Sequence, residues 1–184
     1  MRKIWFDSEF IEYTARLEDG SEKHILDPIS IGCVDDRGRT FRAVFQDFNK
    51  AAAEGNDWIK DNVLAKLPPG EEWETRENVR EALLKYIGDE ECTFHYWFAP
   101  QDAVILMSTL ATHFLDIPKN MHGYPINIAQ KFEDAGCPYH LWPFKANRHE
   151  VLADAIWARD FDQAIDQHIA GTGQYSPPSI SRRL

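Results

Sequence analysis

The chain has 184 residues, with 30 acidic against 20 basic side chains and a formal net charge of -10. A chain of this length buries roughly 70% of its unfolded surface when it folds as one domain, and its 43% hydrophobic content excludes intrinsic disorder. The negative charge argues against a protein that coats duplex nucleic acid through a broad basic face. It does not argue against an enzyme that handles one strand end through bound metal ions, because such ions reverse the local sign of the charge.

The cysteines and the N-terminal residues bear on the compartment. Three cysteines are far apart and form no CxxC pair, which argues against a disulfide scaffold and against a zinc ribbon. Acidic residues begin at Asp7, too early for the apolar region of a secretory signal. The longest apolar runs are far below the roughly 18 residues of a membrane span. We therefore expect a cytoplasmic protein with no membrane association.

The first part of the chain predicts strands. Runs of β-branched and aromatic residues indicate strands at 3–10, 26–34 and 40–45. Asp and Gly residues between the second and third strands predict a hairpin turn. The polar stretch 12–24 is expected to form an inserted loop.

Helices follow, separated by one more strand. Residues 51–64 have helical composition and end before a Pro-Pro-Gly stop, and residues 77–87 have the apolar spacing of an amphipathic helix. A fourth strand is expected over 93–98. The next helix, predicted over 101–115, is apolar almost all round, which indicates a buried helix.

The last third of the chain predicts a short fifth strand and two helices. The strand is expected at 125–128, before a helix that ends near Gly136. Residues 137–146 contain two prolines and three aromatics and predict an ordered loop, and a final helix is expected from about 147 to 170.

This order of elements predicts an α/β fold with a mixed five-stranded sheet flanked by helices: the hairpins come first, and the later crossovers place strands parallel. We expect residues 1–170 to form a single domain. Residues 171–184, with two prolines and two arginines, are expected to form a tail or arm.

Asp7 and Glu9 are two apart on the first predicted strand, so their side chains project from the same face. Two carboxylates on a central strand repel each other and are costly to bury unless something pairs them. A divalent metal is the economical partner, because hard oxygen ligands suit Mg²⁺ or Mn²⁺. The alternative, an edge strand with a solvated acidic face, stays open for this pair alone.

Two more groups of polar residues stand at helix starts. Asp102 follows the fourth strand, where it is either an acid favoured by the helix dipole or a third carboxylate at the carboxyl edge of the sheet. Asn147 and Glu150 have the spacing of a capping box. On that interpretation His149 is a surface histidine. His149 and Asp154, five apart, instead converge beyond the helix start if His149 lies on the preceding loop.

Taken in chain order, these motifs resemble the DEDDh group of 3′-to-5′ exonucleases, which have an RNase H-like fold. Asp7 and Glu9 match its first motif, Asp102 its second, and His149 with Asp154 its third. The stretch 27–34 (DPISIGCV) resembles the second strand of that family. Three more stretches are similar to the mycobacterial polyadenylate-specific exoribonucleases: 62–69 (NVLAKLPP), 101–104 (QDAV) and 136–138 (GCP). The matches run from about residue 3 to residue 160.

The resemblance implies hydrolysis of single-stranded RNA, with poly(A) tails as one candidate, from the 3′ end to nucleoside 5′-monophosphates. It implies two Mg²⁺ or Mn²⁺ ions per site, with Asp7 as the shared ligand, Glu9 and Asp154 completing one metal position, and Asp102 holding the other. His149 is then the general base. The resemblance also implies a homodimer.

Residues beside these acids are the candidates for substrate binding: Ser8, Phe10 and Gln101. Phe10 is either a stacking platform for the terminal nucleotide or a core aromatic, and Tyr96, Trp97 and Phe98 are expected to be core residues first. The polar stretch 12–24 and the residues before Asp102 depart from the family pattern, which leaves base preference open.

Two other functions remain open from the sequence. A DNA-directed 3′-to-5′ exonuclease would use the same five acid and histidine positions. A non-catalytic nucleic-acid-binding module on an RNase H-like fold is the alternative from another class. The intact set of mutually repelling acids argues against the binding module, because a binder has no need of them.

Overall fold

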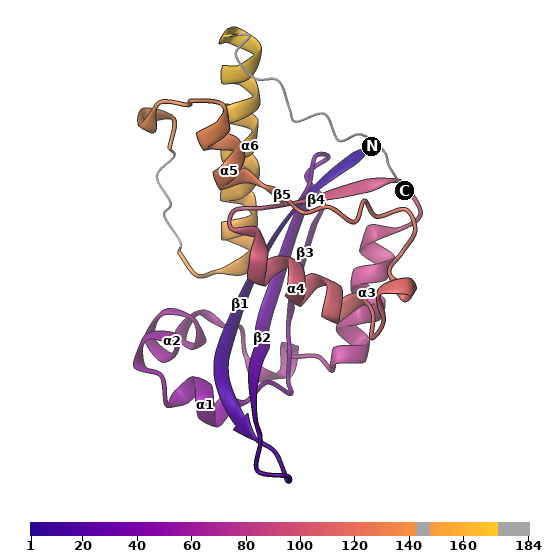
Figure 1. Cartoon of the computed structure of the whole chain (residues 1–184), viewed down its shortest axis with the longest axis vertical. Coiled ribbons are helices and arrows are strands. Elements are labelled where there is room, and N and C mark those ends of the chain that lie inside the picture. The colour runs from indigo at the N-terminus through magenta and orange to yellow at the C-terminus, as the bar shows by residue number, and fades with distance from the viewer. Residues whose placement is uncertain (143–147, 173–184) are drawn as a thin grey trace.

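A computed structural model describes residues 1–142 and 148–172 of the chain (Figure 1). Its centre is a five-stranded sheet in the order β3-β2-β1-β4-β5, which confirms the predicted mixed sheet flanked by helices. The strands are β1 (Arg2–Arg16), β2 (Glu22–Asp35), β3 (Thr40–Val44), β4 (Cys92–Tyr96) and β5 (Ile126–Asn127). β1, β2 and β3 pair antiparallel, whereas β4 runs parallel to both β1 and β5.

β1 and β2 form a hairpin that extends well beyond the other strands (Figure 1). The loop expected over 12–24 is therefore wrong, because pairing continues to Arg16 and Glu22 and only a tight turn remains. In that turn the amide of Leu17 donates to the carbonyl of Ser21 at 2.8 Å. Gly20 adopts φ +82°, a conformation that favours glycine.

Helices cover both faces of the sheet. α3 (Arg76–Ile87) and α4 (Ala99–Leu110) pack on one face, where Phe6 lies in a buried cluster with Leu83 and Leu106. α5 (Ile128–Asp134) and α6 (Val151–Thr172) pack on the other face, over Trp5. Neighbouring residues of β1 thus serve opposite layers, as strand alternation requires.

The helix expected over 51–64 is divided in two. α1 (Lys50–Glu54) ends at Gly55, and α2 (Asp57–Asn62) restarts at once because the Asn56 side chain accepts a hydrogen bond from the Ile59 amide at 3.1 Å. A 3₁₀ turn, η1 (Leu64–Lys66), follows, and another, η2 (Gly70–Glu72), precedes α3. Ile59 and Val63 pack with Ile11 and Ile29 of the long hairpin, which fixes α2 beside it.

β4 and α4 are both shorter than the sequence predicts. β4 ends at Tyr96, so Phe98 is 59% exposed and its assignment to the core is wrong. α4 begins at Ala99, with Pro100 in its first turn, and it ends at Leu110 because Ala111 adopts an extended conformation. Val104 on α4 is exposed, so the helix is buried on one side rather than all round.

The 3₁₀ turn η3 (Phe114–Asp116) lies between α4 and β5, and another, η4 (Tyr139–Leu141), follows α5. α6 starts at Val151 instead of residue 147, and Glu150 accepts from the Ala153 amide at 2.8 Å at its first turn. α6 extends to Thr172 and so includes the first two residues of the expected tail 171–184; the rest of that tail, 173–184, and Asn147 lie outside the described residues. Within the described ranges no helix is both long and apolar enough to cross a membrane.

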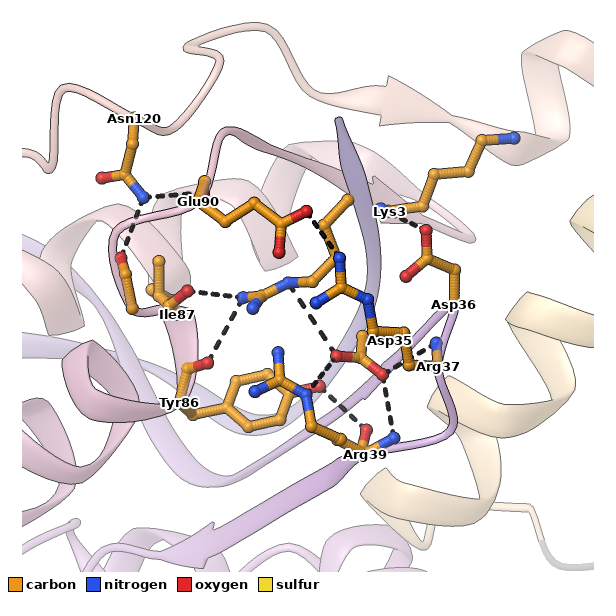
Figure 2. A network of polar contacts seen from close by, with 11 residues as sticks. Lys3, Asp35, Asp36, Arg37, Arg39, Tyr86, Ile87, Glu90 and Asn120 are labelled. Atoms are coloured by element: carbon orange, nitrogen blue, oxygen red, sulfur yellow. Dashed lines mark hydrogen bonds and ion pairs between the residues drawn. The ribbon is translucent and has the colours of Figure 1, made fainter.

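A polar network fixes the end of the sheet at which β1 begins (Figure 2). Asp35, fully buried, accepts from the Arg39 side chain at 2.7 Å and from the amides of Arg37 and Arg39. Burial opposes ionisation of Asp35, but these hydrogen bonds outweigh burial and lower its pKa. Arg2 connects the turn to α3 by donating to the carbonyl of Ile87 at 2.6 Å. The polar residues described next lie further along β1, near its middle.

Candidate active site

Asp7 and Glu9 lie in the middle of the long strand β1, just beyond the point where its pairing with β4 ends at Phe6. Glu9 is 8% exposed, which is unusual for a carboxylate in a protein interior. A register shift follows Glu9, because Glu9 pairs with Ser30 but Phe10 pairs with Pro28. A solvated acidic face on an edge strand, the alternative left open by the sequence, is therefore wrong: β1 is the central strand.

Gly32 of β2 lies directly opposite Asp7 and lets α6 approach the sheet. A Cβ at this position would lie 2.5 Å from the backbone carbon and oxygen of Val151, the first residue of α6. Real Cβ atoms essentially never come so close. Only glycine therefore allows the start of α6 to cross β2 at this distance and to bring its residues beside Asp7.

His149 lies on the loop before α6 and has a backbone φ of 65°. Its amide donates to Oδ2 of Asp154 at 2.9 Å, and its Nδ1 lies 3.4 Å from Oε1 of Glu9. Histidine and aspartate thus converge with β1 from the loop and the first helical turn, as the second interpretation of the sequence predicted.

Glu9, His149 and Asp154 each offer an oxygen or nitrogen atom, and these atoms lie within 4.8 Å of one another. Two carboxylates and an imidazole at this spacing could hold a divalent metal ion, because their donor atoms are those that hard and borderline cations take. Asp154 is only 2% exposed, so a bound cation would compensate the cost of burying its charge.

Asp102 reaches the same site from the first turn of α4. Its Oδ1 accepts from the hydroxyl of Ser8 at 2.5 Å and from the Ser8 amide at 3.1 Å. Ser8 is itself 7% exposed and faces α4, opposite to its neighbours Asp7 and Glu9. The structure therefore gives Ser8 a contact that orients Asp102.

These residues surround one cavity of about 340 Å³, near the lower end of the size range of small-ligand sites. It contains all eight residues singled out in the sequence: Asp7, Ser8, Glu9, Phe10, Gln101, Asp102, His149 and Asp154. Phe10 packs partly on the α3–α4 core cluster while it also lines the cavity.

Sequence reasoning missed the aromatic walls of this cavity. Trp58 of α2 lines it although it is far from every motif, and its ring lies 4.7 Å from the His149 imidazole. Trp97 and Phe98 contribute from the β4–α4 connection. No local sequence pattern marks Trp58 as a site residue. For Phe98 the sequence did contain a signal, because Pro100 indicates that the strand ends nearby and that Phe98 lies outside the sheet.

A buried charge network anchors the middle of α6 to the sheet. The fully buried Asp162 accepts from the indole of Trp5 at 3.0 Å and from Lys131 at 2.5 Å, and His95 Nδ1 lies 2.8 Å from it. Burial disfavours its ionised form, but His95 and Lys131 outweigh burial and hold the pKa of Asp162 below its usual range. Asp154 lies about two helical turns before Asp162 on α6. The contacts that fix Asp162 against the sheet therefore also fix the position of Asp154 relative to β1.

Comparison with known proteins gives two matches. The chain is 31% identical over 158 residues to the 3′-5′ exoribonuclease Rv2179c of Mycobacterium tuberculosis strain H37Rv, with 83% of this chain and 86% of that protein covered. The same values hold for a 3′-5′ exoribonuclease of strain CDC 1551. No family model matches the chain.

Proposed function

Because the chain belongs to the family of these mycobacterial 3′-5′ exoribonucleases, we propose that it is itself a metal-dependent exoribonuclease of the DEDDh type. It hydrolyses single-stranded RNA from the 3′ end and releases nucleoside 5′-monophosphates, with polyadenylate tails as the candidate substrate. One observation carries the proposal: five acid and histidine side chains from β1, α4 and the start of α6 line a single cavity. Residues 1–170 are then one catalytic domain.

The donor set of the cavity fits hard divalent cations. In this proposal Asp7, Glu9, Asp102 and Asp154 are the ligands, with Asp7 shared. The buried positions of Glu9, Asp102 and Asp154 support it, because carboxylates held together at low exposure need a positive partner. Two Mg²⁺ or Mn²⁺ ions, when bound, supply activation of a water molecule and stabilisation of the departing 3′-oxygen.

His149 is the proposed general base. Its imidazole borders the metal-site carboxylates through the 3.4 Å approach to Glu9, close enough to reach a water held there. A ring nitrogen accepts the proton of that water as the water oxygen bonds to the phosphorus and the bond from phosphorus to the 3′-oxygen breaks. The departing 3′-oxygen takes up a proton from solvent, and the imidazolium later releases its own proton to solvent. The hydrogen bond from the His149 amide to Asp154 keeps the loop in the conformation that presents the ring.

Substrate binding is assigned to residues that border the acids. Phe10 offers an aromatic surface for the 3′-terminal base, and Gln101 lies in the first turn of α4 beside Asp102, where its amide can hydrogen-bond the nucleotide. Ser8 acts by orienting Asp102. The partner is a single-stranded RNA end, and we further propose a cytoplasmic homodimer.

The test uses purified protein with Mg²⁺ or Mn²⁺ and three 5′-labelled substrates of equal length: poly(A), a mixed-sequence RNA and single-stranded DNA. The expected result is stepwise shortening from the 3′ end, release of 5′-monophosphates, and fastest turnover of poly(A). EDTA should abolish turnover. Preferred hydrolysis of DNA would indicate a DNA-directed exonuclease, and binding without hydrolysis would indicate a binding module; either result overturns the proposal.

A further inference from the structure

Trp58 is an exposed aromatic side chain that packs on the candidate general base. It lies on α2, and 51% of its surface is exposed, whereas its neighbour Ile59 is only 7% exposed. Its ring centroid lies 4.7 Å from that of His149, with the two planes at 77°, a nearly perpendicular arrangement. Aromatic pairs favour this edge-to-face geometry over direct stacking.

His149 stands at a strained point of the backbone, on the loop before α6. It precedes α6 and adopts φ 65°, a region that non-glycine residues occupy at some cost. Its side chain is 28% exposed and meets Glu9 as its polar neighbour. The indole of Trp58 adds an aromatic contact to this polar one, and a contact on a second side of the ring restricts its rotation about χ1 and χ2 away from Glu9.

The segment 58–66, which carries Trp58, makes a second contact with the loop before α6. Lys66 of η1 donates a hydrogen bond to the backbone carbonyl of Arg148, the residue before His149. On the other side of His149, Glu150 lies 3.7 Å from the Arg42 guanidinium. Two contacts from 58–66, one to a side chain and one to the backbone, therefore converge on the neighbouring residues Arg148 and His149.

This segment is itself well fixed. α2 is capped by Asn56 at its start, and its apolar side packs against the long β1–β2 hairpin through Ile59. β1 also carries Glu9, the other neighbour of the imidazole. The hairpin thus holds both sides of the histidine: Glu9 directly, and Trp58 through α2.

We propose that Trp58 is a positioning residue that holds the His149 imidazole against the metal-site carboxylates. The inference rests on the proposed function and deepens it, because it assigns to α2 the placement of the general base. The competing role is that Trp58 only stacks on a nucleotide base, since it also lines the cavity. The two roles differ in whether the effect of Trp58 depends on His149.

A double-mutant cycle separates them. Trp58→Ala should lower kcat by about 10- to 100-fold, the scale of a misplaced catalytic group, with little change in KM. In a His149→Ala background the same substitution should change kcat by less than about 2-fold, since coupled residues are non-additive. Trp58→Phe, which keeps an aromatic edge, should recover most of the rate.

Phe98→Ala is the matched control, because Phe98 is an exposed aromatic that lines the same cavity from the β4–α4 connection. Its effect should be the same with and without His149. A full multiplicative loss for Trp58→Ala on top of His149→Ala, or a rise in KM that accounts for its whole effect, would overturn the positioning role.

A readout without turnover keeps this inference distinct from the proposed function. In the intact protein the His149 ring protons should show NMR shifts caused by the nearby indole, and Trp58→Ala should move them toward those of a solvent-exposed histidine. Unchanged His149 resonances in the Trp58→Ala protein would refute the contact, whether or not the wild-type protein degrades RNA. A protein that degrades no RNA but loses the ring shift would refute the proposed function while the contact stands.

Discussion

Gly32→Ala tests whether the close crossing of α6 over β2 builds the site. The added Cβ would lie 2.5 Å from the backbone of Val151, whereas ordinary contacts begin at 3.4 Å, so α6 or β2 must shift by about 1 Å. Backbone atoms are the obstacle, and no side-chain rotation relieves the clash. A shift of this size at a catalytic constellation costs on the order of 10²-fold in rate.

The same substitution should lower the free energy of unfolding by about 1 to 3 kcal/mol, the usual cost of overpacking, and Tm by about 2 to 4 °C per kcal/mol. The assay pairs RNA hydrolysis at saturating substrate with thermal unfolding. Gly171→Ala is the control, since a Cβ at Gly171, on the same helix, meets no non-neighbouring atom of the described residues within 4 Å. A Gly32→Ala protein with wild-type turnover would refute the argument that this crossing sets the site.

Three further predictions follow from the same geometry. Asp7→Asn should abolish turnover while Tm stays unchanged or rises, because repulsion between carboxylates is relieved; substantial activity would contradict its role as the shared ligand. His149→Ala should lose about 10² to 10⁴ in rate with Mn²⁺ affinity in calorimetry largely kept; an equal loss of affinity would make it a ligand instead. Since the pKa of Asp162 is lowered in the folded protein, its stabilising effect should be present above about pH 4, the unfolded value, and be lost as pH falls through the folded value. Urea unfolding at pH 7 and pH 3 should therefore show a smaller destabilisation by Asp162→Asn at pH 3, where the unfolded carboxyl is already largely protonated, than at pH 7. A larger destabilisation at pH 3 than at pH 7 would refute the linkage.

The order of strands and helices could be predicted because each element has its own local signal. The outer part of the β1–β2 hairpin was the exception. Its charged composition led to the prediction of a loop over 12–24. Ile11, Tyr13 and Ala15 of β1 are buried or half-buried, while the residues between them are exposed. The period of two that marks a strand was therefore present, but with too few apolar residues to stand out among the charges.

The acids and the histidine could be predicted as candidates because their types and chain order form a recognisable set. The residues that hold these side chains in place, Gly32 and Trp58, could not be predicted. Gly32 is needed because of a helix far along the chain, and that packing leaves no trace in the residues around Gly32. Trp58 reaches His149 only because Gly55 and Asn56 break a helix and redirect α2, which propensity alone assigned to one continuous element.

The supports also explain why the site tolerates so much negative charge in one place. β1 is pinned at its start by the Arg2–Asp35 network, and α6 is pinned in its middle by Asp162, so neither element can move away from the other to relieve repulsion. Folding therefore holds Glu9 and Asp154 together, and on the proposed function this lowers the reorganisation needed to bind a cation. A site held in this way should bind metal with little change in structure. Far-ultraviolet circular dichroism of the EDTA-treated protein should match that of the Mn²⁺-loaded protein, and a large gain of helix on adding metal would show that the cation, rather than the two anchors, assembles the site.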